Sequence, residues 1–203
     1  MKDGSIRELD LTVEARILPL FFRFLQDGFQ LQVQVGCSIS EFLRDRCQLS
    51  HETITNRIST VFLDGQPVDD LNIALIVHDS TLALSGAMPG LAGAVMRSRS
   101  PLRSFRSSIT HLGDDSIAHQ ESGLIRLKLF NTVIGELGIS MLREGILLEP
   151  AAVTGFLEKN TAEIRSRITE MLLDGKPTHT EAVVGMDKLT GCGLVSLTVQ
   201  AQE

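Results

Sequence analysis

The sequence predicts an α+β protein made of two tandem modules packed together, each with the order strand, strand, helix, strand, strand. This prediction starts from an internal repeat, which indicates architecture before any local structure is assigned. Residues 57–67 align without a gap on residues 167–177, and Arg, Ile, Leu, Asp, Gly and Pro are identical at matching positions. Alternating apolar residues, typical of half-buried strands, flank both copies. We therefore expect an internal duplication, which bears on fold and not on chemistry.

Composition shifts and turn signals divide the chain further. The predicted segments are an N-terminal extension at 1–17, a first module at 18–86, a Gly/Arg-rich connector at 87–122 and a second module at 123–203. Within the extension, residues 6–13 alternate in part and can add a short leading strand.

The first module is predicted to open with a hairpin. Asp27-Gly28 is a tight-turn dipeptide, and it lies between Phe22–Phe24 and Phe29–Val35. The second of these segments alternates Phe, Leu and Val with Gln, so one of its faces should be buried. A helix capped by Ser38 or Ser40 should follow, then strands at 59–63 and 80–85.

The end of this module carries a resemblance to a known family. Val61–Asp70, followed by Asp79–Leu84, resembles the second half of a ubiquitin-like β-grasp unit, where a strand, a glycine turn and an Asp-Asp stretch precede a final strand. The resemblance covers residues 18–86 and implies a fold more than a function. Sulfur carriers and ubiquitin-type modifiers of this family end in Gly-Gly, whereas this chain ends in Gln202-Glu203. The family's iron–sulfur proteins need four clustered Cys, which three scattered ones do not supply.

The second module repeats the plan with a longer middle. Leu124–Phe130 alternates as a strand and can turn into Val133–Leu137, and Pro150 suits the first turn of a helix that ends near Lys159. Strands at 168–173 and 193–199 complete the module.

The repeated Asp-Gly-x-Pro sequence has two interpretations. Asp64 and Asp174 could present paired carboxylates. The alternative is a turn that needs a left-handed residue, with Pro67 and Pro177 at a strand edge that donates no hydrogen bond. We favour the turn interpretation because it accounts for each residue. Arg57 and Arg167 then serve as local ion-pair partners.

The connector holds the candidate binding residues. No carboxylate occurs from Ser80 to Gly113 in a chain with a net charge of −6. Guanidinium groups match phosphate and other anions. The candidate anion-binding residues are Arg97, Arg99, Arg103 and Arg106. The candidate interface residues are Met88, Pro89, Leu91, Val95 and Met96. The alternative is a linker that packs between the modules.

Other candidates are weaker. His111, Asp114, Asp115 and His119 match no metal-binding motif, so we predict no metal and no cofactor. Cys37, Cys47 and Cys192 are expected to be free thiols in a reducing cytoplasm. The N-terminus has no secretory h-region, and no apolar run is long enough to span a membrane.

These observations favour a non-catalytic interaction or assembly module that is cytoplasmic and homo-oligomeric. No catalytic motif is present. The acidic charge and the lack of Trp and Tyr disfavour nucleic acid as a partner. One alternative is an anion- or nucleic-acid-binding protein that uses the connector arginines. Another is a small-molecule or metal-dependent enzyme with its site between the modules.

Overall fold

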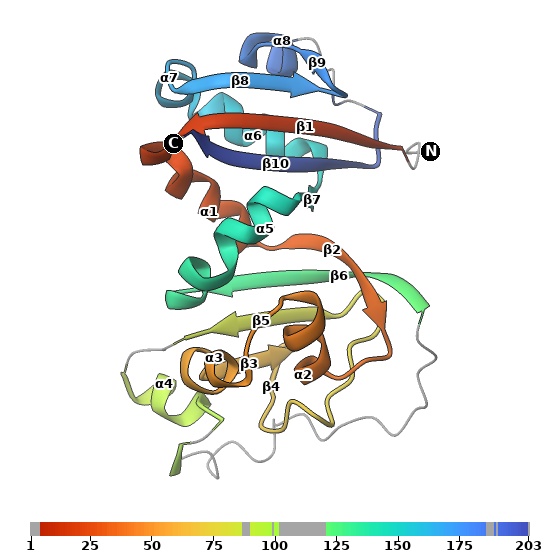
Figure 1. Ribbon diagram of the computed structural model, residues 1–203, viewed down its shortest axis with the longest axis vertical. Helices are drawn as coiled ribbons and strands as arrows, with labels where there is room; N and C mark the ends of the chain where they lie inside the picture. The colour runs from red at the N-terminus through yellow and green to blue at the C-terminus, as the bar shows by residue number, and fades with distance from the viewer. Residues whose placement is uncertain are drawn as a thin grey trace. The chain divides into compact units, whose positions relative to one another are not determined.

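The computed structural model describes residues 5–86, 90–98, 100–101, 121–185, 189 and 191–202. Contacts divide the chain into unit 1, which is Met1–Phe24 with Ile139–Glu203, and unit 2, which is Leu25–Gly138. Both units mix helices with a mostly antiparallel sheet (Figure 1). The fold is therefore α+β, as predicted. Within the described ranges, no helix has the length and apolar character needed to cross a membrane.

The sheet of unit 2 has the order β4-β3-β5-β6-β2. Its strands are β2 (Phe29–Val35), β3 (Thr60–Leu63), β4 (Gln66–Pro67), β5 (Thr81–Ser85) and β6 (Glu121–Phe130). The central pair, β5 and β6, is parallel, and β2 and β3 flank it in antiparallel fashion. The predicted strand over Phe29–Val35 is confirmed, because its Phe, Leu and Val residues are buried.

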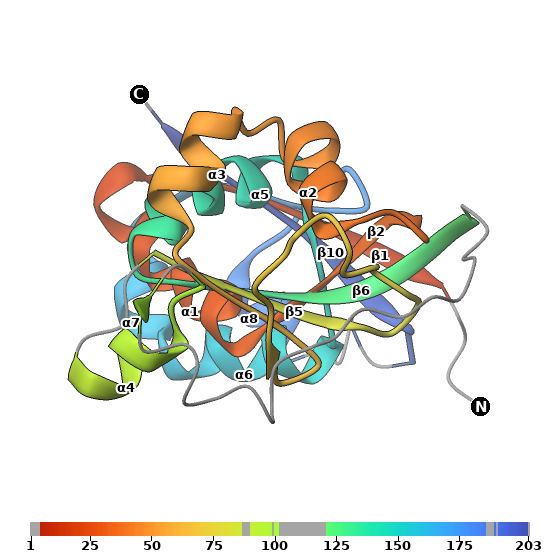
Figure 2. The same cartoon turned by 90° about the horizontal axis from the view of Figure 1, so that it is seen from below.

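Serine caps start the helices of unit 2. Ser38 forms a capping box with Glu41 at the start of α2 (Ile39–Glu41), as the sequence suggested, and Ser50 accepts from the Thr53 backbone at the start of α3 (His51–Arg57). The remaining helical segments are η2 (Phe42–Arg46), α4 (Gly90–Met96) and η4 (Ile134–Gly138). Figure 2 shows α2 and α3 on the same face of the sheet.

The sheet of unit 1 has the order β7-β10-β1-β8-β9. Its strands are β1 (Ile6–Glu14), β7 (Ile146–Leu148), β8 (Ile168–Leu173), β9 (Lys176–Pro177) and β10 (Leu194–Gln202). The central strands β1 and β10 are parallel, and β8 and β7 flank them in antiparallel fashion.

Helices of unit 1 pack through aromatic contacts. The described helices are η1 (Ala15–Ile17), α1 (Leu18–Asp27, whose last three residues belong to unit 2), α5 (Ile139–Glu144), α6 (Pro150–Lys159), α7 (Thr161–Ile164) and α8 (Thr180–Gly185). The ring of Phe156 in α6 lies 5.1 Å from that of Phe21 and 4.6 Å from that of Phe24, between ring centroids. Pro150 begins α6, as predicted.

The strands of the two units share one pattern of directions. In each unit a short edge strand (β4 or β9) pairs with an antiparallel strand (β3 or β8), which in turn is antiparallel to the central parallel pair (β5 and β6, or β1 and β10). A last antiparallel strand (β2 or β7) follows on the other side of that pair. The central pair differs in order. In unit 2 the strand next to the outer hairpin is β5, which follows that hairpin in the chain, whereas in unit 1 it is β1.

Two predicted hairpins are wrong. Phe22–Phe24 lies in α1, and Val133–Leu137 lies in helical turns that include η4. The reason is periodicity: Phe21, Phe24 and Leu25 are buried at a helical spacing of three and four residues. Gly28 (φ +104°) therefore follows a helix and does not turn a hairpin.

The division into units also differs from the predicted segments. The N-terminal extension supplies β1, a central strand of unit 1, and β6 lies in unit 2 although residues 123–130 were assigned to the second module. The central pair of unit 1 thus combines the first and last of the described strands, whereas that of unit 2 combines two consecutive ones.

Candidate functional site

The two repeated Asp residues hold turns. Asp64 and Asp174 both have φ +50°. The Thr81 backbone N–H donates to Asp64 Oδ1 at 2.6 Å, and the Glu8 N–H donates to Asp174 Oδ1 at 3.0 Å. The backbone bond from Glu8, followed by the Arg7 guanidinium, lowers the pKa of Asp174. The turn interpretation is therefore confirmed. Each carboxylate holds its turn to the neighbouring central strand by a hydrogen bond, which is called the Asp clip below.

The repeated arginines form ion pairs away from these turns. Arg57 Nε lies 3.5 Å from Glu136 Oε1, and Arg167 Nη1 lies 3.9 Å from Glu14 Oε2. Glu14 is the last residue of β1, whereas Glu136 lies in η4. Each of the matched arginines thus forms an ion pair, with an acidic partner on a different kind of element.

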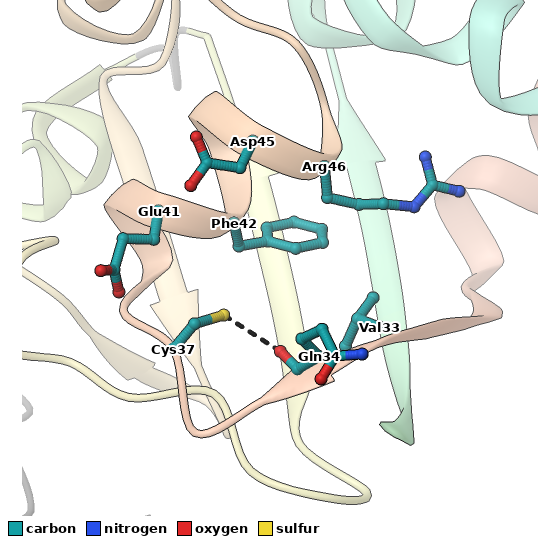
Figure 3. Close-up of a pocket in the computed structure, with 7 residues that line it drawn as sticks. All are labelled: Val33, Gln34, Cys37, Glu41, Phe42, Asp45 and Arg46. Atoms are coloured by element: carbon teal, nitrogen blue, oxygen red, sulfur yellow. Dashed lines mark hydrogen bonds between the residues drawn. The ribbon is translucent and has the colours of Figure 1, made fainter. Parts of the chain in front are cut away.

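A first pocket, of about 330 Å³, lies in unit 2 beside Cys37 (Figure 3). Glu41, Phe42, Asp45 and Arg46 of the helical segment line it, and Figure 3 shows the Cys37 thiol pointing to the Gln34 carbonyl. The distance from Cys37 Sγ to that oxygen is 3.1 Å. Burial, then the charge of Glu41, raises the pKa of the Cys37 thiol. The protonated thiol is therefore favoured at neutral pH, and it is a poor nucleophile.

The carboxylates of this pocket have structural roles. Glu41 Oε2 accepts from both the backbone N–H and the hydroxyl of Ser38 at 2.8 Å, and these bonds lower its pKa. Asp45 accepts two bonds from the Arg44 guanidinium, at 2.7 and 2.9 Å. The two carboxylates of the pocket thus serve the capping of α2 and a local ion pair.

A larger hollow, of about 530 Å³, lies in unit 1 and is called the β8 groove below. Residues 168–171 of β8 form one side, residues 177–181 form the other, and Arg165 lies at one end. An ion pair of 2.8 Å joins Arg165 Nε to Glu181 Oε1. The Thr178 N–H donates to the Met171 carbonyl at 2.9 Å and fixes the loop against the strand.

The β8 groove contains an open strand edge. β9 pairs only with Leu172 and Leu173, so Ile168–Glu170 has β1 on one side and no strand of the described chain on the other. Figure 1 shows β8 outside β1, with α7 at the start of β8. Thr169 and Glu170 are exposed. Such an edge can template pairing with another extended chain.

The matched edge in unit 2 is covered. Ser59, which aligns with Thr169, accepts from the Ser98 N–H at 3.2 Å through its carbonyl. Ser98 and Pro101 line a pocket of about 240 Å³ beside Ser59. Thr60, which aligns with Glu170, is fully buried.

The structure describes only part of the predicted connector site. Arg97 is exposed, and Val95 and Met96 are half-buried. Arg99, Arg103, Arg106, Met88 and Pro89 lie outside the described residues, as do His111, Asp114, Asp115 and His119, and the side chain of Leu91 is not described. The connector anion site and interface therefore stay predictions.

No group of three or more His, Cys, Asp and Glu within the described ranges could hold a metal ion. The three cysteines are free, and Cys192 is buried with its thiol donating to the Leu189 carbonyl.

Sequence reasoning missed the β8 groove. One signal was available in the repeat itself: Glu170 occupies the position of Thr60, and a charged residue in a strand is typical of an exposed position. The width of the groove, in contrast, depends on the loop at 177–181, whose position the repeat does not predict.

Comparison with known proteins supplies no relative for this chain: it matches no protein-family model, no curated protein and no solved structure.

Proposed function

We propose that this protein is a non-catalytic interaction module that binds an extended segment of a partner protein in the β8 groove. The observation that carries this proposal is the open edge at Ile168–Glu170. An extended peptide can add to such an edge through backbone hydrogen bonds, while the side chains of the groove select its sequence.

The pocket beside Cys37 supports a binding role over a catalytic one. Cys37 has a raised pKa, and Glu41 and Asp45 are engaged by Ser38 and Arg44. Catalytic groups generally need a pKa matched to their task and a free path to a substrate. Glu41 instead caps a helix, and Asp45 pairs with the neighbouring Arg44.

We also propose that each unit is a β-grasp-like module and that the two arose by duplication. The shared strand directions, the two Asp clips and the two arginine ion pairs support this proposal. Gly28 (φ +104°) and Gly145 (φ +100°) add a further match, because each lies between a helix and the next strand.

Selection from a random peptide library tests the proposed function. Ten-residue peptides displayed on phage are selected on the full chain and then tested on Glu170→Lys and Glu163→Lys. Both residues are exposed glutamates of unit 1, but Glu163 does not line the groove. We expect peptides that bind the wild type and Glu163→Lys and lose at least about tenfold in affinity for Glu170→Lys, which equals about 1.4 kcal/mol.

Hydrogen exchange locates the bound peptide. A selected peptide should slow exchange at residues 168–171 and 177–181 and leave the amides around Cys37 unchanged. If no enriched peptide distinguishes the two variants, or if protection falls elsewhere, the proposed function is wrong.

A further inference from the structure

The contact that covers the strand edge at Ser59 in unit 2 indicates what could bind at the matched, open edge at Thr169 in unit 1; we call the contact in unit 2 the template. Ser59 and Thr169 occupy the same position in the repeat, and their hydroxyls have the same role. Ser59 Oγ donates to the Gly86 carbonyl just after β5, and Thr169 Oγ1 donates to the Thr12 carbonyl in β1 at 3.1 Å. Both side chains thus bond to a carbonyl of the neighbouring central strand, but one residue apart in register, because Thr12 is the partner of Glu170 whereas the partner of Thr60 is Ser85. The two positions are matched in the repeat, and each immediately precedes a residue that pairs with the central strand.

The template shows what kind of contact this edge accepts. In unit 2 the Ser98 N–H donates to the Ser59 carbonyl at 3.2 Å, and Ser98 Oγ lies 3.4 Å from the same oxygen. In unit 1 no loop or helix N–H of the described residues donates to the Thr169 carbonyl. An extended chain passing the Thr169 carbonyl could supply the equivalent bond.

Charge favours a basic segment at this position. Glu170 is exposed, and among the residues described it has no ion-pair partner, whereas Glu181 is paired with Arg165. The template residue Ser98 lies between Arg97 and Arg99 in an acid-free stretch of sequence. A guanidinium beside the edge would give Glu170 a partner that forms charge-assisted hydrogen bonds.

We infer that the β8 groove binds an extended segment of a partner protein in which a serine lies between arginines, with the serine N–H donating to the Thr169 carbonyl and an arginine pairing with Glu170. This inference rests on the proposed function and adds the chemical class of the partner. The backbone bond positions the segment, and the charge pair selects its sequence.

A synthetic peptide provides the probe. Residues 94–103 of this chain, Ala-Val-Met-Arg-Ser-Arg-Ser-Pro-Leu-Arg, are labelled with fluorescein and added in trans to the full protein, with fluorescence anisotropy as the readout. A second peptide carries N-methylserine at position 98, which removes the backbone donor and keeps the charge. A third has glutamine at positions 97 and 99, which removes the charge and keeps the donor.

We expect the parent peptide to bind the wild type and Glu163→Lys equally and to bind Glu170→Lys at least about tenfold more weakly, since the variant places like charges together. The N-methylated peptide should lose about fivefold or more in affinity, because one backbone hydrogen bond is removed. The glutamine peptide should lose a similar factor and show a weaker dependence on salt.

Three results would overturn the inference. The first is a parent peptide that does not bind. The second is a full loss of discrimination, with Glu170→Lys binding as well as Glu163→Lys or the N-methylated peptide binding as well as the parent. The third is light scattering that shows wild-type self-association lost in Glu170→Lys, which would assign the groove to a second copy of the chain. If library peptides without an Arg-Ser pattern occupy the groove, the inference fails while the proposed function stands.

Discussion

Matched strands β3 and β8 differ most where each begins. Thr60 in β3 is fully buried, while Glu170, at the same position of the repeat, is exposed. The covering in unit 2 includes Ser98, which bonds to Ser59, whereas in unit 1 the loop after β9 lines the opposite side of a groove and leaves the edge open. Similar strand sequences can therefore end as a covered edge or an open one, and the segments packed beside them decide which.

The two Asp turns bond to central strands that differ in sequence position, yet the bonds are the same. Asp64 clips its turn to β5, and Asp174 clips its turn to β1. These strands come from different places in the chain, yet each runs antiparallel to the strand before its turn and makes the same pair of bonds. One residue of the central strand, Thr81 or Glu8, donates its N–H to the Asp carboxylate and accepts the Asp N–H through its carbonyl. The turn thus requires a strand of a certain direction and register, not a particular sequence.

Exchanging the matched residues is the strongest test of the first difference. Thr60→Glu would bury a carboxylate with no partner, and we expect it to lower the free energy of unfolding by at least about 3 kcal/mol. Glu170→Thr, at an exposed site, should change it by less than about 0.5 kcal/mol. Urea denaturation of the full chain measures both.

A control isolates the charge at position 60. Among the described residues Thr60 Oγ1 has no hydrogen-bond partner, so Thr60→Val should be neutral or slightly stabilising. If Thr60→Glu and Glu170→Thr cost the same, the two strand starts are equally exposed and the comparison fails.

The glycines that follow the matched helices test the similarity of the units. Gly28→Ala and Gly145→Ala should each destabilise the protein by about 1–3 kcal/mol, because φ near +100° strains any residue with a Cβ atom. Gly155→Ala in α6 is the matched control, since an added Cβ meets nothing within 4 Å and alanine favours a helix. Melting temperatures compare the three variants. If only one of Gly28→Ala and Gly145→Ala lowers the melting temperature, the two glycines do not have the same role and the proposed similarity of the units fails at this point.

A smaller effect should follow acidification. The pKa of Asp174 is lowered in the folded protein, so its contribution is present above the unfolded pKa of about 3.9 and is lost as pH falls through the folded value. Its side chain is 43% exposed, which keeps the contribution to about 1 kcal/mol or less. Asp174→Asn should therefore be less stable than the wild type at pH 7 and differ less from it at pH 2. If the stability difference between Asp174→Asn and the wild type is the same at pH 7 and pH 2, the Asp174 hydrogen bond does not depend on the charge of the carboxylate.

Local features were the predictable part of this fold. Alternation in Phe29–Val35, the Ser38 cap and the two Asp-Gly turns each depend on a few neighbouring residues, and the structure confirms all of them. The hairpin predicted at Asp27-Gly28 was wrong because Asp-Gly suits both a tight turn and the end of a helix. The buried spacing of Phe21, Phe24 and Leu25 was the better guide.

The candidate site was less predictable than the fold. The repeat drew attention to Asp64 and Asp174, which are turn residues, and the composition drew attention to the connector arginines, most of which lie outside the described residues. The β8 groove needs β8, β9 and the start of α8 together. No single segment of the sequence contains that arrangement.

The sequence by itself determined the α+β class, the repeated turn and the burial pattern of individual strands, because periodicity and turn chemistry act over a few residues. Only the tertiary structure decided that β1 lies beside β8, that β6 lies beside β2, and that one matched edge is covered while the other is open. The physical reason is that an amphipathic strand fits beside many partners. The choice among them depends on packing and on the connection of segments that are distant in the sequence.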